Sequence, residues 1–227
     1  MITAHLPSIS INRFKIHSLF LEDMGYDTIT EAVESFKAGN FVVIVDETRE
    51  CEADLVLAAE FAREDKITFM VNNTTGIITI PLTEKRAREL ELPLMVQTAE
   101  NSEKHCTNFT VSVDAINDEM TTGVSSKDRT RTILTIVSGK QKSLARPGHI
   151  FPLIAKDSLL QRQGHTEASI TLCRLAGLRE IAVICELLNK EEERAGTMMN
   201  KEEAFQFARS YNLKIISIQQ LIDHLKE

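Results

Sequence analysis

Residues 45–54 combine the side-chain types of a site for a divalent metal and an anionic substrate. Five carboxylates and Arg49 directly follow the apolar run 41–44, and no lysine lies among them. Carboxylates this close repel one another unless a cation, a substrate or partner side chains neutralise them. Arg49 adds a planar fork for a carboxylate or a phosphate. A solvated turn is the alternative, but a buried strand that ends in so many carboxylates favours a site.

A second candidate site lies where a helix is expected to begin. Gly164 stands at a turn, and Thr166 and Glu167 open an apolar-periodic helix, which leaves backbone N–H groups free to hold a phosphate. Arg162 adds a second fork beside them. His165 suits a metal site, because a neutral imidazole and a carboxylate together fit Mg²⁺ or Mn²⁺. The alternative is an ordinary helix N-cap with an exposed histidine.

Two further residues are candidates for proton transfer. Residues 146–149 read Arg-Pro-Gly-His, and proline with glycine fixes the backbone, so that His149 points in a defined direction. A surface histidine in a turn is the alternative. Glu186 ends the apolar run 181–185, so it either has a structural partner or is held ready for chemistry. Ligands of open α/β sheets gather at the carboxyl ends of strands, which groups Glu186 with residues 45–54.

The elements that must position these groups alternate between strands and helices. A capping box at Thr28 and Glu31 opens the first helix, and Gly39 ends it. Apolar runs predict strands at residues 41–45, 55–59, 76–81, 109–113, 150–154, 181–187 and 213–216. Helical periodicity is clearest at residues 83–90, 126–137, 166–175 and 201–211. The alternation predicts an α/β sandwich, and the short connection between the first two strands makes its sheet mixed.

The composition is that of an ordinary globular protein. The 227 residues are 43% apolar and 26% charged, which favours one domain with a sizeable core. We expect an N-terminal extension at residues 1–26, which lack a clear period, and a single domain at residues 27–227. The net charge of −7 argues against nucleic acid or an anionic membrane as a partner.

Several other classes of protein are disfavoured. The 4 cysteines have neither CxxC nor zinc-site spacing, which indicates reduced thiols. No apolar run is long enough to span a bilayer, and the first twenty residues lack the apolar core of a secretory signal, so a cytoplasmic protein is expected. Without a GxGxxG motif, a Walker loop or a nucleophile elbow, dinucleotide, ATP and serine-hydrolase chemistry have no support.

Six segments, taken in order, make the chain resemble the 3,4-dihydroxy-2-butanone 4-phosphate synthases of riboflavin biosynthesis. They are residues 49–54, 121–125, 128–129, 146–149, 164–167 and 185–187. The resemblance extends over about residues 28–225. It implies an α/β (α+β) three-layer sandwich with a mixed twisted sheet covered by helices, acting as a homodimer with sites near the subunit interface. It also implies the stand-alone form rather than a fusion with GTP cyclohydrolase II.

The resemblance implies a lyase that converts D-ribulose 5-phosphate to L-3,4-dihydroxy-2-butanone 4-phosphate and formate, with two Mg²⁺ or Mn²⁺ ions per site. Enolisation beside a ketone needs a metal on the sugar oxygens and a nearby base. The implied metal ligands are Glu50 and His165. The implied substrate-binding residues are Arg49, Glu50, Asp54, Arg162, Gln163, Gly164, His165, Thr166 and Glu186. His149 and Glu186 are the implied proton-transfer residues, with Glu52 as a supporting group or a further base.

Four positions depart from the pattern of the family. Cys51 and Ala53 stand where the family usually has Asn and Gly, and Cys106 and Asn108 where it has Gly and a small residue. If position 53 requires a positive φ, Ala53 costs about 1–2 kcal/mol or reshapes the loop. Two alternatives therefore stay open, a divergent paralogue acting on another sugar phosphate and a catalytically impaired binding or regulatory homologue. The acidic balance disfavours a nucleic-acid-binding relative.

Overall fold

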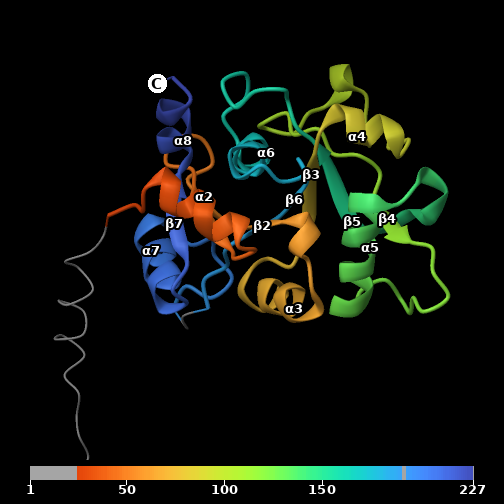
Figure 1. Ribbon diagram of the computed structural model, residues 1–227, viewed down its shortest axis with the longest axis horizontal. Helices are drawn as coiled ribbons and strands as arrows, with labels where there is room; N and C mark the ends of the chain where they lie inside the picture. Colours follow the sequence, from red (N-terminus) through yellow and green to blue (C-terminus); the bar gives the residue numbers. More distant parts are fainter. Residues whose placement is uncertain (1–24, 191–192, 227) are drawn as a thin grey trace, which may run out of the picture.

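Seven strands in the described part of the chain form one mixed sheet (Figure 1). The computed structural model describes residues 25–190 and 193–226. The strands are β1 (Val42–Val45), β2 (Ala53–Ala58), β3 (Thr79–Leu82), β4 (Val113–Ala115), β5 (Leu144–Ile154), β6 (Ala182–Glu186) and β7 (Lys214–Ser217). They lie in the order β4-β5-β3-β6-β2-β1-β7. β1 is parallel to β7 and β3 to β5, and the other neighbours are antiparallel, so the predicted mixed sheet is confirmed.

Helices cover both faces of this sheet and complete three layers (Figure 1). They are α2 (Ile29–Lys37), α3 (Glu64–Asn73), α4 (Glu84–Glu89), α5 (Ser126–Ser138), α6 (His165–Ala176), α7 (Lys201–Ser210) and α8 (Ile218–His224). Neighbouring residues of a strand face opposite sides of the sheet and so divide the core in two. Val43 and Leu55 share one apolar cluster with α3, α5 and α7, whereas Ile44 and Val56 share the other with α2, α6 and α8. The predicted three-layer α/β fold is therefore confirmed.

The first helix follows its predicted signals. The Thr28 hydroxyl accepts a hydrogen bond of 3.2 Å from the N–H of Glu31, and the Glu31 carboxylate accepts one of 3.0 Å from the N–H of Thr28. Gly39, one residue beyond the C-cap, has a φ of +86° and ends the helix. The capping box and the glycine stop are both confirmed.

The predictions were wrong in detail at the β4 edge of the sheet. Phe109 and Thr110 make isolated bridges, and β4 begins only at Val113, so residues 109–113 are not a strand. The sequence places residues 146–149 in a turn, whereas they lie inside β5. Helices α3 and α8 were not predicted. α3 begins without a side-chain cap and so lacks a conspicuous start signal. α8 continues directly from β7 but begins with a capping box of Ser217 and Gln220, a signal that the sequence predictions did not use.

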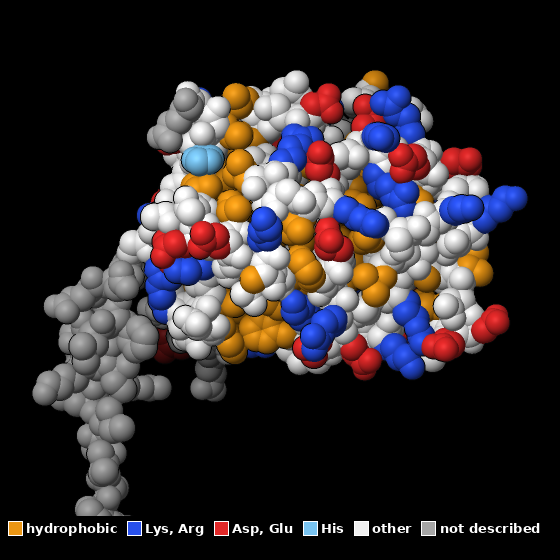
Figure 2. Space-filling view, in the orientation of Figure 1, with side chains coloured by type: hydrophobic (Ala, Val, Ile, Leu, Met, Phe, Trp, Pro, Cys, Tyr) orange, Lys and Arg blue, Asp and Glu red, His pale blue; other side chains and the backbone are white. Residues whose placement is uncertain are grey.

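Two expectations concern the surface and the chain end. Among the described residues, no helix is both long and apolar enough to cross a membrane. Figure 2 shows one face of the molecule on which basic and acidic side chains are interspersed. The expected extension at residues 1–26 lies outside the described residues except for Gly25 and Tyr26, so its boundary stays a prediction.

Candidate active site

The charged motifs gather at one edge of the sheet, the edge formed by the strand ends where β1 and β6 finish and β2 begins. β1 ends where residues 46–52, here called the acidic loop, begin, and β2 returns from that edge with Asp54. Asp54 lies opposite Glu186 in the β2–β6 ladder. α6 begins beside them, since Nε2 of His165 lies 3.2 Å from the carbonyl oxygen of Ile44. The topology therefore brings together residues from distant parts of the sequence.

Asp46 organises the acidic loop and was not among the predicted site residues. Its Oδ1 accepts hydrogen bonds from the backbone N–H groups of Thr48 (2.9 Å) and Arg49 (3.0 Å), and its Oδ2 accepts one from Glu50 (3.2 Å). Burial raises the pKa of Asp46, but these hydrogen bonds outweigh burial and hold the pKa below its ordinary value. An aspartate at the start of a loop is a typical signal for such a turn, and this signal was available in the sequence.

Asp54 and His165, which are buried, and Glu50, which is half-buried, form a group that we call the Glu50–His165 centre. Nδ1 of His165 lies 3.2 Å from Oε2 of Glu50 and 3.8 Å from Oδ1 of Asp54. Burial lowers the pKa of His165, but the charge of Asp54 and the hydrogen bond to Glu50 outweigh it and raise the pKa to about 9. Burial raises the pKa of Asp54 to about 8, and nearby carboxylates contribute to the rise. The hydrogen bond from His165 lowers the pKa of Glu50.

The donors of this centre fit a divalent cation. Neighbouring ligands of an octahedral Mg²⁺, at about 2.1 Å each, lie about 3.0 Å apart, and Glu50 Oε2 and His165 Nδ1 are 3.2 Å apart. The Ile44 carbonyl accepts a hydrogen bond from Nε2, which selects the tautomer with a free lone pair on Nδ1. Oδ1 of Asp54 is buried and has no hydrogen-bond partner within the described residues, so it offers a further acceptor.

These donors form an open site rather than a closed cage. In residues 25–190 and 193–226, no group of three or more His, Cys, Asp and Glu side chains is arranged to hold a metal. Mg²⁺ in proteins usually keeps several waters and takes one or two carboxylates together with substrate oxygens. A cation held by Glu50 and His165 would therefore complete its shell with water or with a bound substrate.

Two further carboxylates lie at the same edge. Burial raises the pKa of Glu52 above its ordinary value, and the charges of Glu186 and Glu50 raise it further. Oε2 of Glu186 accepts a hydrogen bond of 2.6 Å from the hydroxyl of Thr75, a residue that the sequence predictions did not include. A carboxylate held beside a polar centre is a suitable acid or base.

The guanidinium of Arg162 already donates hydrogen bonds to other groups of the protein. It donates to Glu167 at 2.6 Å and to the Thr107 hydroxyl at 2.7 Å, and its Nε donates to the carbonyl of His105 at 3.2 Å. Arg162 therefore connects the segment 103–107 to the start of α6 rather than standing free as a fork. Its positive charge still lies beside the helix N-terminus.

The start of α6 keeps the features of a phosphate cradle. Gly164 is its N-cap, and no side-chain hydrogen bond closes this end of the helix. A Cβ at Gly164 would collide with Nη1 of Arg162, so a larger residue there would displace the guanidinium. Thr166 is buried in the first turn, and Gln163 is exposed just before it. The first N–H groups of the helix are thus available to an anion.

His149 lies at the same edge of the sheet but makes its contacts elsewhere. It precedes the part of β5 that pairs with the start of β3, where Phe151 lies opposite Thr79. Nδ1 of His149 lies 2.7 Å from Oδ2 of Asp114 on β4. Within the described residues, its ring makes no hydrogen bond or ion pair with the Glu50–His165 centre.

Two departures from the family pattern occupy left-handed backbone positions. Cys51 has a φ of +55° and Cys106 a φ of +53°, which Asn and Gly adopt more readily than Cys. Ala53 is instead the first residue of β2 and does not have a positive φ, so the condition for strain at position 53 is not met. Nη2 of Arg49 lies 3.5 Å from Nδ1 of His105, so the two loops that carry the cysteines meet beside Arg49.

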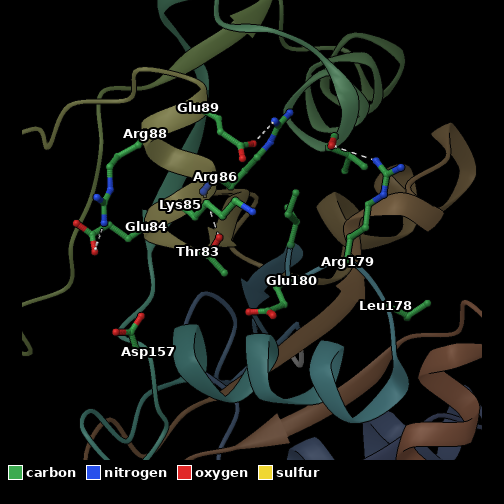
Figure 3. A pocket seen from close by; sticks show the side chains of 12 residues that line it. Thr83, Glu84, Lys85, Arg86, Arg88, Glu89, Asp157, Leu178, Arg179 and Glu180 are labelled. Carbon is green, nitrogen blue, oxygen red and sulfur yellow. Dashed lines mark hydrogen bonds and ion pairs between the residues drawn. The ribbon is translucent and has the colours of Figure 1, made fainter.

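A pocket of about 720 Å³ lies at the opposite edge of the sheet (Figure 3). Its lining follows β3 and β5 and precedes β6, and it includes Asp157. Arg86 pairs with Glu89 at 2.9 Å and Arg88 with Glu84 at 3.0 Å. Arg179 donates to the carbonyl of Val137 at 3.2 Å. Because two of the three arginines that line this pocket are paired with carboxylates, it is a weaker candidate for an anionic substrate than the Glu50–His165 centre.

Comparisons with known sequences point to one family. The sequence model described as 3,4-dihydroxy-2-butanone 4-phosphate synthase matches residues 30–224. The Candida albicans protein named 3,4-dihydroxy-2-butanone 4-phosphate synthase is 40% identical over 206 residues, covering 89% of this chain and 98% of that protein. A protein of Oryza sativa subsp. japonica, named probable bifunctional riboflavin biosynthesis protein RIBA 2, chloroplastic, is 44% identical over 207 residues. This chain covers 36% of the length of the rice protein and 49% of RibBA from Porphyromonas gingivalis.

Solved structures agree with this result. A crystal structure described as 3,4-dihydroxy-2-butanone 4-phosphate synthase in complex with two magnesium ions matches with a TM-score of 0.83 and 40% identity, covering 88% of this chain and 97% of that one. A cation-free form matches with a TM-score of 0.81 and 39% identity, covering 89% and 98%. The resemblance seen in the six motifs is confirmed, and the chain belongs to the family of enzymes named 3,4-dihydroxy-2-butanone 4-phosphate synthase.

Proposed function

We propose that this chain converts D-ribulose 5-phosphate to L-3,4-dihydroxy-2-butanone 4-phosphate and formate, as a divalent-metal-dependent lyase of riboflavin biosynthesis. The observation that carries the proposal is the Glu50–His165 centre, with its two donor atoms 3.2 Å apart, in a chain of this family. The complex of a related synthase with two magnesium ions supports two Mg²⁺ ions at this site, for which Mn²⁺ is the proposed alternative.

Glu50 and His165 would hold the metal, which when bound polarises the sugar oxygens beside the ketone. To act as a ligand, His165 must release its Nδ1 proton while Nε2 keeps its hydrogen bond to Ile44. Arg49 and Asp54 flank these donors and would bind the sugar. Oδ1 of Asp54, which has no hydrogen-bond partner within the described residues, would accept a hydrogen bond from a sugar hydroxyl.

The phosphate would bind at the start of α6. The backbone N–H groups that follow Gly164, the hydroxyl of Thr166, the amide of Gln163 and the charge of Arg162 would hold it there. Because Arg162 is fixed by Glu167, it would act through its charge and by shaping the turn. A phosphate at this position places the sugar between α6 and the acidic loop.

Proton transfer would fall to Glu186, Glu52 and His149. Enolisation removes a proton from a carbon beside the ketone, and the product then needs one returned. The raised pKa of Glu52 suits a group that takes up a proton. Thr75 holds the carboxylate of Glu186 in place. Rearrangement of the carbon skeleton and release of formate further require a pocket that excludes water.

We also propose a cytoplasmic homodimer that binds the sugar phosphate but neither nucleic acid nor a membrane. The net charge of −7 and the interspersed charges of the face in Figure 2 support the last two points. The resemblance of the motifs to the family supports the homodimer.

A divergent paralogue acting on another sugar phosphate is the second candidate. The left-handed Cys51 and Cys106 favour it, because both lie in the loops that meet at Arg49. In that case the double variant Cys51→Asn, Ala53→Gly should gain activity on D-ribulose 5-phosphate. An impaired binding homologue is disfavoured, because such a scaffold has little reason to keep Arg49, Glu50, His165 and Glu186 together.

The proposal is tested by following formate release from D-ribulose 5-phosphate and Mg²⁺, with and without EDTA. Metal-dependent formate is the expected result, and ribose 5-phosphate serves as a matched control substrate that lacks the ketone. Folded protein that binds Mg²⁺ but releases no formate would refute the proposed activity and direct the search to other sugar phosphates.

A further inference from the structure

Glu167 is a buried carboxylate in the first turn of α6 that has no part in the proposed chemistry. The residue is 2% exposed, yet both of its carboxylate oxygens accept hydrogen bonds from other parts of the chain. Oε2 accepts one from Nη1 of Arg162 at 2.6 Å, and Oε1 accepts one from the backbone N–H of Lys156 at 3.0 Å. Burial of a charge is costly unless the charge is paired and hydrogen-bonded. The carboxylate therefore holds the guanidinium in one defined position.

Arg162 extends this contact to residues 101–107, here called the 101–107 loop. Its Nη2 donates to the hydroxyl of Thr107 at 2.7 Å, and its Nε donates to the carbonyl oxygen of His105 at 3.2 Å. The side chain of Arg162 is 11% exposed and that of Glu167 is 1% exposed, so little water competes for these hydrogen bonds. Because the guanidinium is planar and rigid, its contact with Glu167 also determines where its other donors point.

The 101–107 loop has few other attachments to the rest of the molecule. The carboxylate of Glu103 accepts hydrogen bonds from two backbone N–H groups of the same loop, at 2.8 Å and 2.7 Å. Within the described residues, the hydrogen bonds from this loop to residues outside positions 98–109 involve only Arg162 and Arg49. The position of the loop therefore depends on Arg162.

The same loop lies beside the candidate active site. Nδ1 of His105 lies 3.5 Å from Nη2 of Arg49, which belongs to the acidic loop. The 101–107 loop thus contacts the acidic loop on one side and, through Arg162, the start of α6 on the other. These are the two sides between which the sugar phosphate is proposed to bind. A loop closed across such a site excludes water and retains the substrate.

We propose that Glu167 is a positioning residue that keeps the 101–107 loop closed through Arg162 and thereby increases the affinity for the substrate. The role in affinity rests on the proposed function. Within the described residues, the side chain of Glu167 makes no hydrogen bond or ion pair with the Glu50–His165 centre, so it acts through Arg162. A protein whose binding-competent state is only partly populated binds its ligand more weakly.

Cleavage by trypsin after Lys104, an exposed residue of the loop, measures loop opening in the full chain without any substrate. In Glu167→Gln an amide with one acceptor oxygen replaces a carboxylate with two, so either Arg162 or the N–H of Lys156 loses its acceptor. We expect cleavage after Lys104 to become about 10- to 100-fold faster. Cleavage after Lys85, which is exposed on α4, should not change. Equal acceleration at both sites would show a general loss of stability and overturn the proposal.

A second variant tests the same link without altering a buried charge. Thr107→Val removes one acceptor of the guanidinium, so cleavage after Lys104 should become about 3- to 10-fold faster. Glu180→Gln is the matched control, because Glu180 pairs with Arg174 of α6 at 2.7 Å, away from the loop. This variant should leave the cleavage unchanged. Unchanged cleavage in Thr107→Val would overturn the proposal even if Glu167→Gln does not fold.

Steady-state kinetics test the role in affinity. Glu167→Gln should raise KM for D-ribulose 5-phosphate about 3- to 10-fold with little change in kcat, because the closed complex keeps its reacting groups. An unchanged KM, or a loss confined to kcat, would overturn the proposal. If the unaltered protein releases no formate while cleavage after Lys104 responds as expected, the link from Glu167 to the loop holds and the proposed activity is refuted instead.

Discussion

The two ring nitrogens of His165 have different partners, and this difference determines what the residue can do. Nε2 faces the carbonyl of Ile44 and Nδ1 faces Glu50, each at 3.2 Å. Both partners are acceptors and the pKa of His165 is raised, which favours an imidazolium with hydrogen on both nitrogens when no metal is bound. A cation held by His165 would take the place of the Nδ1 proton, so metal binding and proton release at this residue would be linked.

We expect Glu50→Gln or His165→Ala to abolish metal-dependent turnover while leaving the fold intact. Each change removes one of two protein ligands, so the affinity for Mg²⁺ should fall by more than about 100-fold. Calorimetric titration with Mg²⁺, together with formate release, measures both effects. Glu47→Gln, at an exposed carboxylate of the same loop, is the control and should keep its activity. Full activity of either ligand variant would refute the metal assignment.

The left-handed position of Cys51 gives a prediction about stability. Glycine adopts a φ near +55° without the steric cost of a side chain, so Cys51→Gly should raise the free energy of unfolding by about 0.5–1 kcal/mol. Ala53 is in strand β2, where glycine weakens the element, so Ala53→Gly should lower it by about 0.5–1 kcal/mol. Urea denaturation of both variants under reducing conditions tests the pair. Changes of the same sign would contradict this assignment of strain.

At the scale of elements, long apolar runs and capping residues predicted most of the helices and strands. β1, β2 and β6 read as apolar runs because they are buried on both faces. β4 was misplaced because it is only three residues long and its ladder is broken by the bulge at residues 146–149. The sequence also did not predict the contacts of Asp46, Thr75 and Asp114. Most side chains of the candidate site could be recognised in the sequence by their residue types. The partners that orient these side chains could not, because those contacts depend on the register between strands.

Asp27 links the start of α2 to α7 and β7, and it gives a pH-dependent prediction. Burial raises its pKa, but hydrogen bonds from Arg209, the Ile215 N–H and Lys214 outweigh burial and lower it. The stability that this ionised group contributes is therefore present above its ordinary pKa of 3.8 and is lost as the pH falls through its lower folded-state pKa.

Asp27→Asn should lower the free energy of unfolding by about 2 kcal/mol at pH 7, because it weakens charge-assisted hydrogen bonds. The difference from the unaltered protein should shrink as the pH falls below 3.8. Urea denaturation across this range measures it. Asp65→Asn, at a fully exposed aspartate, is the comparison and should show a much smaller effect. A loss for Asp27→Asn that is independent of pH would contradict the linkage.

At the scale of the whole molecule, the Glu50–His165 centre and His149 share one sheet edge, with β3 lying between β5 and β6. Ile77 and Val124 are exposed to 55% and 46%, and Arg129 connects their loops by donating to the carbonyls of Gly76 and Val124 at 2.8 Å each. Exposed apolar side chains beside charged groups are typical of an interface. They support the proposed homodimer with sites near the subunit boundary.

We therefore expect two inactive variants, Glu50→Gln and His149→Gln, to restore activity when their chains are mixed in dimers. If each site takes Glu50 from one subunit and His149 from the other, every mixed dimer contains one intact site. Random pairing then gives about a quarter of the full activity. Co-expression with two different affinity tags isolates the mixed dimer for the assay. Mixed dimers without activity would show that each site is completed within one chain.

Glu50 and His165 are separated by 115 positions in the sequence, so they meet only when the long-range contacts of the sheet have formed. An unfolded chain has no comparable pair to offer, and a bound cation therefore favours the native state by mass action. At a metal concentration of 100 times the dissociation constant, the gain is about 2.7 kcal/mol. Magnesium titrated into a denaturation experiment thereby reports on complete folding, and this ion would protect newly made chains from unfolding as well as serve their chemistry.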